Sequence, residues 1–231
     1  MQPYFFPYLG YFSLIKHVDR FVLLDAVQFI RHGWIERNRI LKPGEGWQYV
    51  HAPLLKHHRE TVIRDLVIDN QQPWQQKLVA QLQHCKKTAP HFSAVMRLLD
   101  EVFSTEYRTV VALNKATLDA TCRYLKIATP IDVFSDLNLA IAPVSAPDEW
   151  ALNICRAVGG VREYWNPPGG ESLFDRAKYD AHQIQLRFQS VRLEPYDQRR
   201  PVFEPGLSIL DVMLFNSPEQ IGQMLDAYEL A

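Results

Sequence analysis

The first twelve residues, MQPYFFPYLGYF, constrain the fold more than any other part of this chain. They contain six aromatic side chains, two prolines and one glycine, and Gln2 is the one strongly polar residue among them. Chain ends usually fray, so this much aromatic surface at the very start needs an explanation. A prolyl loop leads through Gly10 into a helix, and the aromatic side chains of the segment have two interpretations: they pack in the core or line a pocket.

The length and composition indicate one globular domain, which we place over residues 1–231. The chain is 47% hydrophobic and 22% charged, which argues against disorder, and its net charge of −1 gives no bulk attraction to nucleic acid. No apolar run approaches the roughly 20 residues that span a bilayer, so we expect no membrane insertion. No signal peptide is apparent, and Cys85, Cys122 and Cys155 are odd in number. We therefore expect free thiols in a reducing cytoplasm.

Hydrophobic periodicity predicts an α/β protein. The patterns predict helices over 13–20, 73–87, 91–104, 110–127, 147–160 and 218–230, a helix that begins near Ser208, strands over 21–25, 47–54, 61–68, 129–137 and 182–191, and loops over 42–46 and 162–175. Strands and helices alternate early and late in the chain, around a helical middle. We therefore expect a central parallel or mixed sheet with a helical insertion at about 73–127.

Polar residues gather beyond the first predicted strand, which ends at Asp25. Loops beyond the carboxyl ends of strands collect ligands in α/β folds, so we predict that Asp25 and Gln28 act as a base and its hydrogen-bonding partner. A turn cap is the alternative for Asp25. Trp34, Asn38 and Arg39 follow, and Arg39 offers a bidentate fork for phosphate or carboxylate. Because adjacent residues cannot all point the same way, we expect Asn38 or Arg39 to face the site, and the alternative is a solvated face with one packed tryptophan.

Further candidates lie at both ends of the chain. Tyr8 and Tyr11 have aromatic faces that suit a sugar or a nucleobase, and Gln2 would sit at a strand end if a strand precedes it. Tyr164 and the Gly169–Gly170 loop could place backbone N–H groups against an anion. Gln198 follows the last strand and has free donors and acceptors. Turns, caps and core packing are the alternatives for these residues.

Two histidine-containing segments suggest other chemistry, which we do not favour. His51, His57 and His58 have no cysteine or carboxylate at a familiar ligand spacing, so we expect a solvated loop and no metal site. His84 and Cys85 are adjacent on a predicted helix, where neighbouring side chains point in different directions. We therefore expect no nucleophilic cysteine.

Several motifs together resemble the WbqC-like family. They are MQPYFFPYLGYF, D-x-V-Q-F-I, G-W-I-x-R-N-R-I-L, APHF at 89–92, the Tyr164/Gly169/Gly170 loop, Y-D-Q at 196–198 and G-L-S-I-L-D at 206–211. The resemblance implies a bacterial cytosolic protein that is often encoded among genes for O-antigen, other surface polysaccharides or specialised metabolites. It also implies a few aliphatic residues before Gln2 that form a first strand, so we expect that the start at Met1 trims this strand.

The N-terminal strand–loop–helix unit also resembles the opening of nucleotidyltransferases with an H-x-G-H loop. Tyr8 and Tyr11 occupy the places of the loop histidines. Tyrosine is neutral at pH 7, so it supplies no cation for nucleotide phosphates, and this departure argues against adenylyl transfer.

We predict a group-transfer enzyme, with acyl or aminoacyl transfer to an amine such as an amino sugar as the favoured reaction. The sequence identifies no cofactor. A small-molecule or nucleotide-linked sugar is the expected substrate, with charged tRNA, acyl-CoA or a carrier protein as possible donors. Nucleotidyl transfer and a non-catalytic accessory role in glycan assembly are the alternatives.

Overall fold

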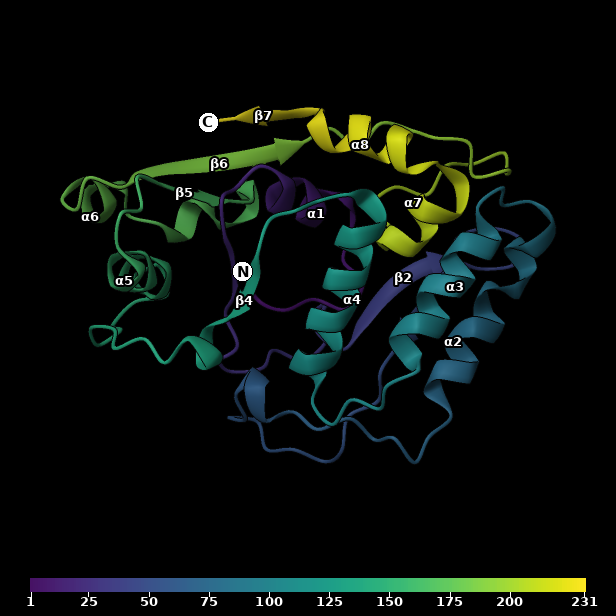
Figure 1. The fold of residues 1–231 in the computed structure, drawn as a ribbon, viewed down its shortest axis with the longest axis horizontal. Helices are drawn as coiled ribbons and strands as arrows, with labels where there is room; N and C mark the ends of the chain where they lie inside the picture. The colour runs from purple at the N-terminus through teal and green to yellow at the C-terminus, as the bar shows by residue number, and fades with distance from the viewer.

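The computed structural model describes all 231 residues, which form short helices and short strands (Figure 1). The helices are α1 (Leu9–Lys16), α2 (Trp74–Leu82), α3 (Phe92–Phe103), α4 (Val110–Leu125), α5 (Glu149–Val158), α6 (Arg176–Asp180), α7 (Ile209–Phe215) and α8 (Pro218–Asp226). The strands are β1 (Phe21–Leu23), β2 (Arg37–Leu41), β3 (Trp47–His51), β4 (Ile131–Val133), β5 (Glu163–Asn166), β6 (Gln185–Val191) and β7 (Tyr228–Leu230). None of the helices is both long enough and apolar enough to cross a membrane.

The strands form three small sheets. β1 and β4 are parallel, β2 and β3 form an antiparallel hairpin, and β5, β6 and β7 form a mixed sheet. The predicted α/β class is confirmed, with parallel and antiparallel pairs, but the prediction of one central sheet is wrong. The strands are three to seven residues long, and no strand lies between β1 and β5 to join the two parallel pairs.

The helical middle is confirmed, because α2, α3 and α4 fall within the predicted 73–127. Several local predictions are wrong. The predicted 218–230 helix ends at Asp226, and Tyr228–Leu230 form β7. Residues 61–68 form a short 3-10 turn at Ile63–Asp65 with isolated bridges instead of a strand, because Ile63 and Leu66 are buried at helical spacing. β5 lies inside the predicted 162–175 loop, and β2 was not predicted. The first helix begins at Leu9, so Tyr11 and Phe12 are helical.

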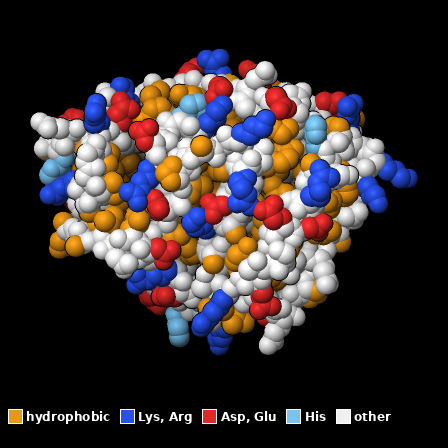
Figure 2. Space-filling model, viewed as in Figure 1, with side chains coloured by type: hydrophobic (Ala, Val, Ile, Leu, Met, Phe, Trp, Pro, Cys, Tyr) orange, Lys and Arg blue, Asp and Glu red, His pale blue; other side chains and the backbone are white.

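Most of the buried apolar residues belong to one core. This cluster of 47 residues includes side chains from α1, α2, α3, α4, α7 and α8. In Figure 1, α4 lies in front of β2, with α2 and α3 on the right and α5 and α6 on the left. A second cluster, made of Leu152, Tyr179, Ile184, Leu186 and Phe188, holds α5, α6 and β6 together. On the face shown in Figure 2, acidic and basic side chains are interspersed.

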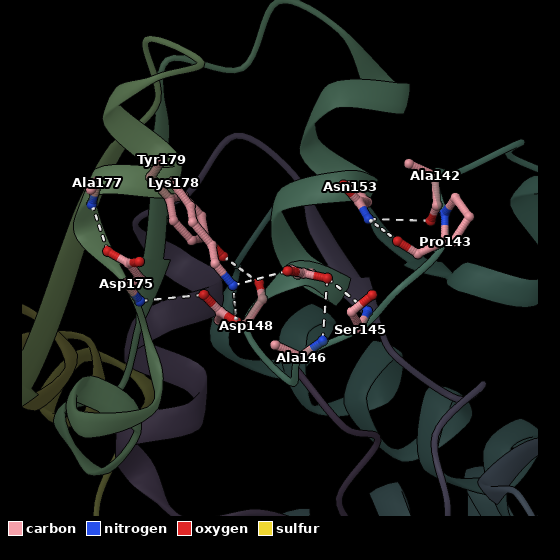
Figure 3. Close-up of polar contacts among 11 residues, drawn as sticks. Ala142, Pro143, Ser145, Ala146, Asp148, Asn153, Asp175, Ala177, Lys178 and Tyr179 are labelled. Carbon is pink, nitrogen blue, oxygen red and sulfur yellow. Dashed lines mark hydrogen bonds and ion pairs between the residues drawn. The ribbon is translucent and has the colours of Figure 1, made fainter.

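A polar network fastens α6 to the start of α5 (Figure 3). The Lys178 Nζ lies 3.1 Å from the buried Asp148 carboxylate and 2.9 Å from Glu149. The Tyr179 hydroxyl donates to the Asp148 carbonyl at 2.8 Å. Hydrogen bonds from the backbone N–H of Ser145 and from Lys178 lower the pKa of Glu149. These contacts hold the start of α5 against α6, whose Tyr179 belongs to the second cluster.

The aromatic start is buried without being helix or strand. Residues 2–7 have no regular secondary structure, and the Phe5 and Phe6 side chains are fully buried. Phe6 has a φ of 39°, a conformation that is rare for a bulky residue. An irregular buried segment cannot satisfy its own backbone groups, and an unpaired buried carbonyl costs free energy. The segment must therefore find hydrogen-bond donors elsewhere in the chain.

Those donors come from distant parts of the protein. The Asn114 side chain donates to Pro3 O at 2.9 Å and to Ile35 O at 2.8 Å. The Asn38 side chain donates to the Phe5 and Phe6 carbonyls at 3.0 and 2.9 Å. The Ser208 hydroxyl also donates to Phe6 O at 2.7 Å, and the Ile209 N–H donates to Pro7 O. The start of the chain is thus a buried loop that β2, α4 and α7 fix in place.

We predict that Asn114→Ala lowers the free energy of unfolding by at least about 2 kcal/mol, because two buried carbonyls lose their donor. Urea unfolding measures the change. Gln76→Ala is the matched control, since Gln76 is an exposed amide on α2 without a hydrogen bond, and it should change stability by no more than about 0.5 kcal/mol. If the two substitutions lowered the free energy of unfolding equally, the hydrogen bonds from Asn114 to the two carbonyls would make no measurable contribution to stability.

Candidate functional site

The β2–β3 hairpin has one buried face and one outward face. Successive side chains of a strand alternate between faces, and Asn38 and Val50, which are paired across the hairpin, are both buried. The neighbouring pairs place Arg37 opposite His51 and Arg39 opposite Tyr49. Trp47 and Tyr49 are each 37% exposed. The outward face therefore combines arginines with aromatic rings.

Arg39 is held between two tryptophans. Its guanidinium carbon lies 5.3 Å from the Trp34 ring centre and 5.1 Å from the Trp47 ring centre, which is within the range of a cation–π contact. The Arg37 guanidinium lies over the Tyr49 ring at 4.2 Å. We call these five residues, Trp34, Arg37, Arg39, Trp47 and Tyr49, the arginine–aromatic face.

The guanidinium of Arg39 is not neutralised within the chain. It forms no ion pair, and its Nη2 donates to the Gly206 carbonyl at 3.2 Å while its Nε is buried without a partner. Arg200, on the neighbouring loop, also lacks an ion pair and has a buried, unpartnered Nε. An unpaired cation that keeps free N–H donors is suited to a phosphate or a carboxylate.

A buried network holds the loop that contacts Arg39. Gln198 donates to the Glu204 carbonyl at 3.0 Å, accepts from the Glu204 N–H at 2.9 Å, and donates to Asp211 at 3.1 Å. The Tyr196 hydroxyl donates to the same Asp211 oxygen at 2.6 Å. Gln198 therefore closes the loop that ends at Gly206. Both the oxygen and the nitrogen of its amide are engaged within the chain, so its donors and acceptors are not free as the sequence suggested.

The predicted residues near the first strand have structural contacts. Asp25 is buried, and its two carboxylate oxygens accept from the Ser135 N–H at 3.1 Å and from the Ser135 hydroxyl at 2.5 Å. These contacts cap the turn at 134–137, which is the alternative that the sequence left open for Asp25, and its role as a base stays a prediction. Gln28 is exposed and donates to the Arg59 carbonyl at 2.9 Å. Of Asn38 and Arg39, the first faces the core and the second faces outward.

The predicted tyrosines lie in two places. The Tyr11 hydroxyl is buried and donates to the Gln2 carbonyl at 2.7 Å, and burial raises its pKa well above the usual value. Tyr8 is half-buried, and its ring covers Gly10 so closely that a Cβ there would lie 2.6 Å from it. Tyr164 stacks on Tyr179 with ring centres 5.8 Å apart. Tyr164 thus packs against the second cluster and is not part of the arginine–aromatic face.

A groove of about 680 Å³ separates β1 from β5. Met1, Leu24 and Tyr164 are among the residues that line it. The Met1 amine donates to Val22 O at 3.0 Å, and the Leu24 N–H donates to Met1 O at 2.7 Å, which is the pattern of a parallel ladder. Burial lowers the pKa of this amine to about 6. The strand expected before Gln2 stays a prediction.

The prediction that the His84 and Cys85 side chains point in different directions is wrong. Cys85 Sγ lies 3.3 Å from His84 Nε2, because residues 83–87 form a 3-10 turn in which the two side chains meet. Burial raises the pKa of the Cys85 thiol to about 11 and lowers the pKa of His84. Both groups are therefore neutral at pH 7, and a neutral thiol is a poor nucleophile. No group of three or more His, Cys, Asp or Glu side chains is placed to hold a metal ion.

Comparison with known proteins gives one family and one relative of note. A family model described as "WbqC-like protein family" matches residues 2–223. The chain is also similar to a Mycobacterium tuberculosis (strain ATCC 25618 / H37Rv) protein named "Uncharacterized protein Rv1507c", with 32% identity over 219 residues, covering 94% of this chain and 91% of the relative. No solved structure matches the chain, so the resemblance to nucleotidyltransferases has no structural neighbour to support it.

The buried Asp211 predicts a measurable pH dependence. Burial raises its pKa from 3.8 to about 6, so the folded state keeps this proton to a higher pH than the unfolded chain. The stability that the protonated acid supplies is complete below about pH 4 and is lost as the pH rises through 6. Relative to Asp211→Asn, wild type should lose about 2 kcal/mol of unfolding free energy between pH 4 and pH 7. Urea unfolding of both proteins at each pH tests this, and a difference that is constant with pH would contradict it.

Proposed function

The chain belongs to the WbqC-like protein family, and we propose that it is a group-transfer enzyme of bacterial surface-polysaccharide, O-antigen or related metabolite biosynthesis. The proposed reaction is transfer of an acyl or aminoacyl group to an amine, such as the amine of an amino sugar. We propose that it acts in the cytoplasm on a small-molecule or nucleotide-linked sugar.

The observation that supports this proposal most directly is the unpaired guanidinium of Arg39. Two tryptophans hold it by contacts that use none of its N–H groups, and a single N–H bonds to Gly206. Donors of acyl groups are built on phosphates or on carriers that bear a phosphate, so each of them presents an anion. Arg39 would bind that anion, and Trp34 would limit its access to water.

The remaining predicted residues take roles in this proposal that follow from their positions. Asn38 and Gln198 are positioning residues, because each uses its amide to hold a backbone segment next to Arg39. Tyr164 would contribute to the acceptor side, because it lines the groove between β1 and β5. Gln2, Tyr8 and Tyr11 stay proposed substrate-binding residues, although the Tyr11 hydroxyl is engaged by the Gln2 carbonyl. Asp25 with Gln28 remains the proposed base and its partner, which requires a substrate to compete with the contacts to Ser135.

Thermal unfolding in the presence of candidate donors tests the proposal. A ligand that binds the folded state raises the melting temperature by mass action, so we expect a rise with one class among acyl-CoAs, charged tRNA, nucleotide sugars and acyl carrier proteins. Arg39→Ala should remove the rise. Arg156→Ala should keep it, because Arg156 is an exposed arginine on α5 without a partner.

The pattern of outcomes separates the proposal from its alternatives. A rise with ATP or CTP together with pyrophosphate release would instead indicate nucleotidyl transfer. No rise with any class would favour an accessory protein of glycan assembly.

Asp25→Asn separates catalysis from capping. The amide keeps one oxygen acceptor for Ser135 and loses the charge, so we expect the unfolding free energy to fall by about 1–3 kcal/mol. If Asp25 is the base, complementation of a deletion strain should be lost even at a temperature where the variant is folded, as judged by circular dichroism. Full complementation would show that Asp25 is a cap alone. Ser135→Ala is the matched control, because it weakens the cap and leaves the carboxylate in place.

A further inference from the structure

We propose that the arginine–aromatic face recognises a nucleoside phosphate, with the base stacked on Trp47 and the phosphate bound by Arg39. The inference rests on the proposed function, since it names the chemistry of the donor that Arg39 binds. The same chemistry occurs in a free nucleotide or nucleotide-bearing donor and at the single-stranded end of an RNA.

The Trp47 and Tyr49 rings of this face are partly exposed, whereas other aromatic side chains of the protein are buried in its core. Trp47 and Tyr49 are each 37% exposed, while Trp74 is buried in the core together with all three phenylalanines of the first segment. Their ring centres lie 5.0 Å apart with planes inclined at 73°. Because Arg37 lies over the Tyr49 ring at 4.2 Å, Trp47 is the ring that offers a face to a planar base. Stacking on aromatic rings is the usual way in which proteins bind unpaired bases.

The charge of the face complements a phosphate. Arg37, Arg39 and Arg200 form no ion pair, whereas Arg20, Arg123 and Arg192 each pair with a carboxylate. Arginines without an ion pair also occur elsewhere, as at Arg156, so the distinguishing feature of this face is that its cations lie against partly exposed aromatic rings. The nearby Glu204 does not neutralise them, since it too forms no ion pair and its backbone is engaged by Gln198.

The distances join the two parts of the face. Arg39 lies 5.1 Å from the Trp47 ring centre, and Arg200 is tied to the hairpin turn by bonds to the Gly46 and Lys42 carbonyls at 3.1 and 2.9 Å. A cation–π contact leaves the edge of a guanidinium free to donate. A ligand that stacks on Trp47 therefore has its phosphate within reach of Arg39, and neither a bare phosphate nor a bare nucleoside would use both parts.

Isothermal titration of the whole protein tests the inference with four probes: ADP, adenosine, inorganic phosphate, and a short single-stranded RNA ending in CCA. We expect ADP or the RNA to bind at least about 10-fold more tightly than adenosine or phosphate. Tighter binding of ADP would assign the face to a free nucleotide or a nucleotide-bearing donor, and tighter binding of the RNA would assign it to an RNA end. Equal affinity for phosphate and ADP would overturn the inference, because the rings would then contribute nothing.

Substitutions at Trp47 provide the matched control. Trp47→Phe keeps a ring, whereas Trp47→Leu keeps apolar surface without a π-face. We expect Trp47→Leu to weaken ADP or RNA binding by about 5- to 100-fold, the range that base stacking supplies, and Trp47→Phe to restore most of it. Equal binding by the two variants would overturn the inference.

The result also separates this inference from the proposed function. Nucleotide binding without any transfer of an acyl group would leave the inference standing and the function wrong. Transfer from a donor that carries no nucleotide, in a protein that does not bind ADP or the RNA, would support the proposed function and overturn the inference.

Discussion

Hydrogen bonds to the carbonyl groups of a buried, irregular aromatic segment are the constraint on which this structure depends. Two prolines deny the segment a helix or a central strand, yet its phenylalanines are buried completely. The remaining solution is to bring donors to it from outside. Asn38, Asn114 and Ser208 supply them from β2, from α4 and from the start of α7, so the positions of these three elements relative to one another follow from the first eight residues.

The same constraint reaches the candidate site through a single strand. Asn38 turns inward to hold the Phe5 and Phe6 carbonyls, and strand geometry then turns Arg39 outward. The Arg39 carbonyl also accepts from the Ser208 N–H at 2.8 Å, and the Arg39 side chain contacts Gly206. Packing of the aromatic start therefore fixes where the guanidinium stands. This link explains why two adjacent residues of one motif have opposite surroundings.

The sequence predicted elements better than it predicted their assembly. Helical periodicity identified α2, α3 and α4, and a Ser217/Gln220 pair caps α8 as a capping box, since both signals are local. The hairpin partner β2 was missed because R-N-R-I-L does not alternate between polar and apolar, since its inward-facing residue Asn38 is polar. Candidate residues such as Asp25 and Gln198 were identified by type and position, but a side chain that binds a ligand and one that caps a turn have the same chemistry. Only their partners, Ser135 and Glu204, distinguish the two roles.

The long reach of these bonds has a consequence for how the protein is made. The Ser208 hydroxyl and the Phe6 carbonyl are 202 residues apart in the chain, and the Ser13 hydroxyl bonds to Leu225 O across 212 residues. Because ribosomes add about 5–20 residues per second, the aromatic start waits roughly 10 to 40 seconds before its last partners are synthesised. During that time its phenylalanines have no complete core to enter. The apolar start of the chain therefore stays exposed for most of synthesis, and its burial is completed only after the last helices are made.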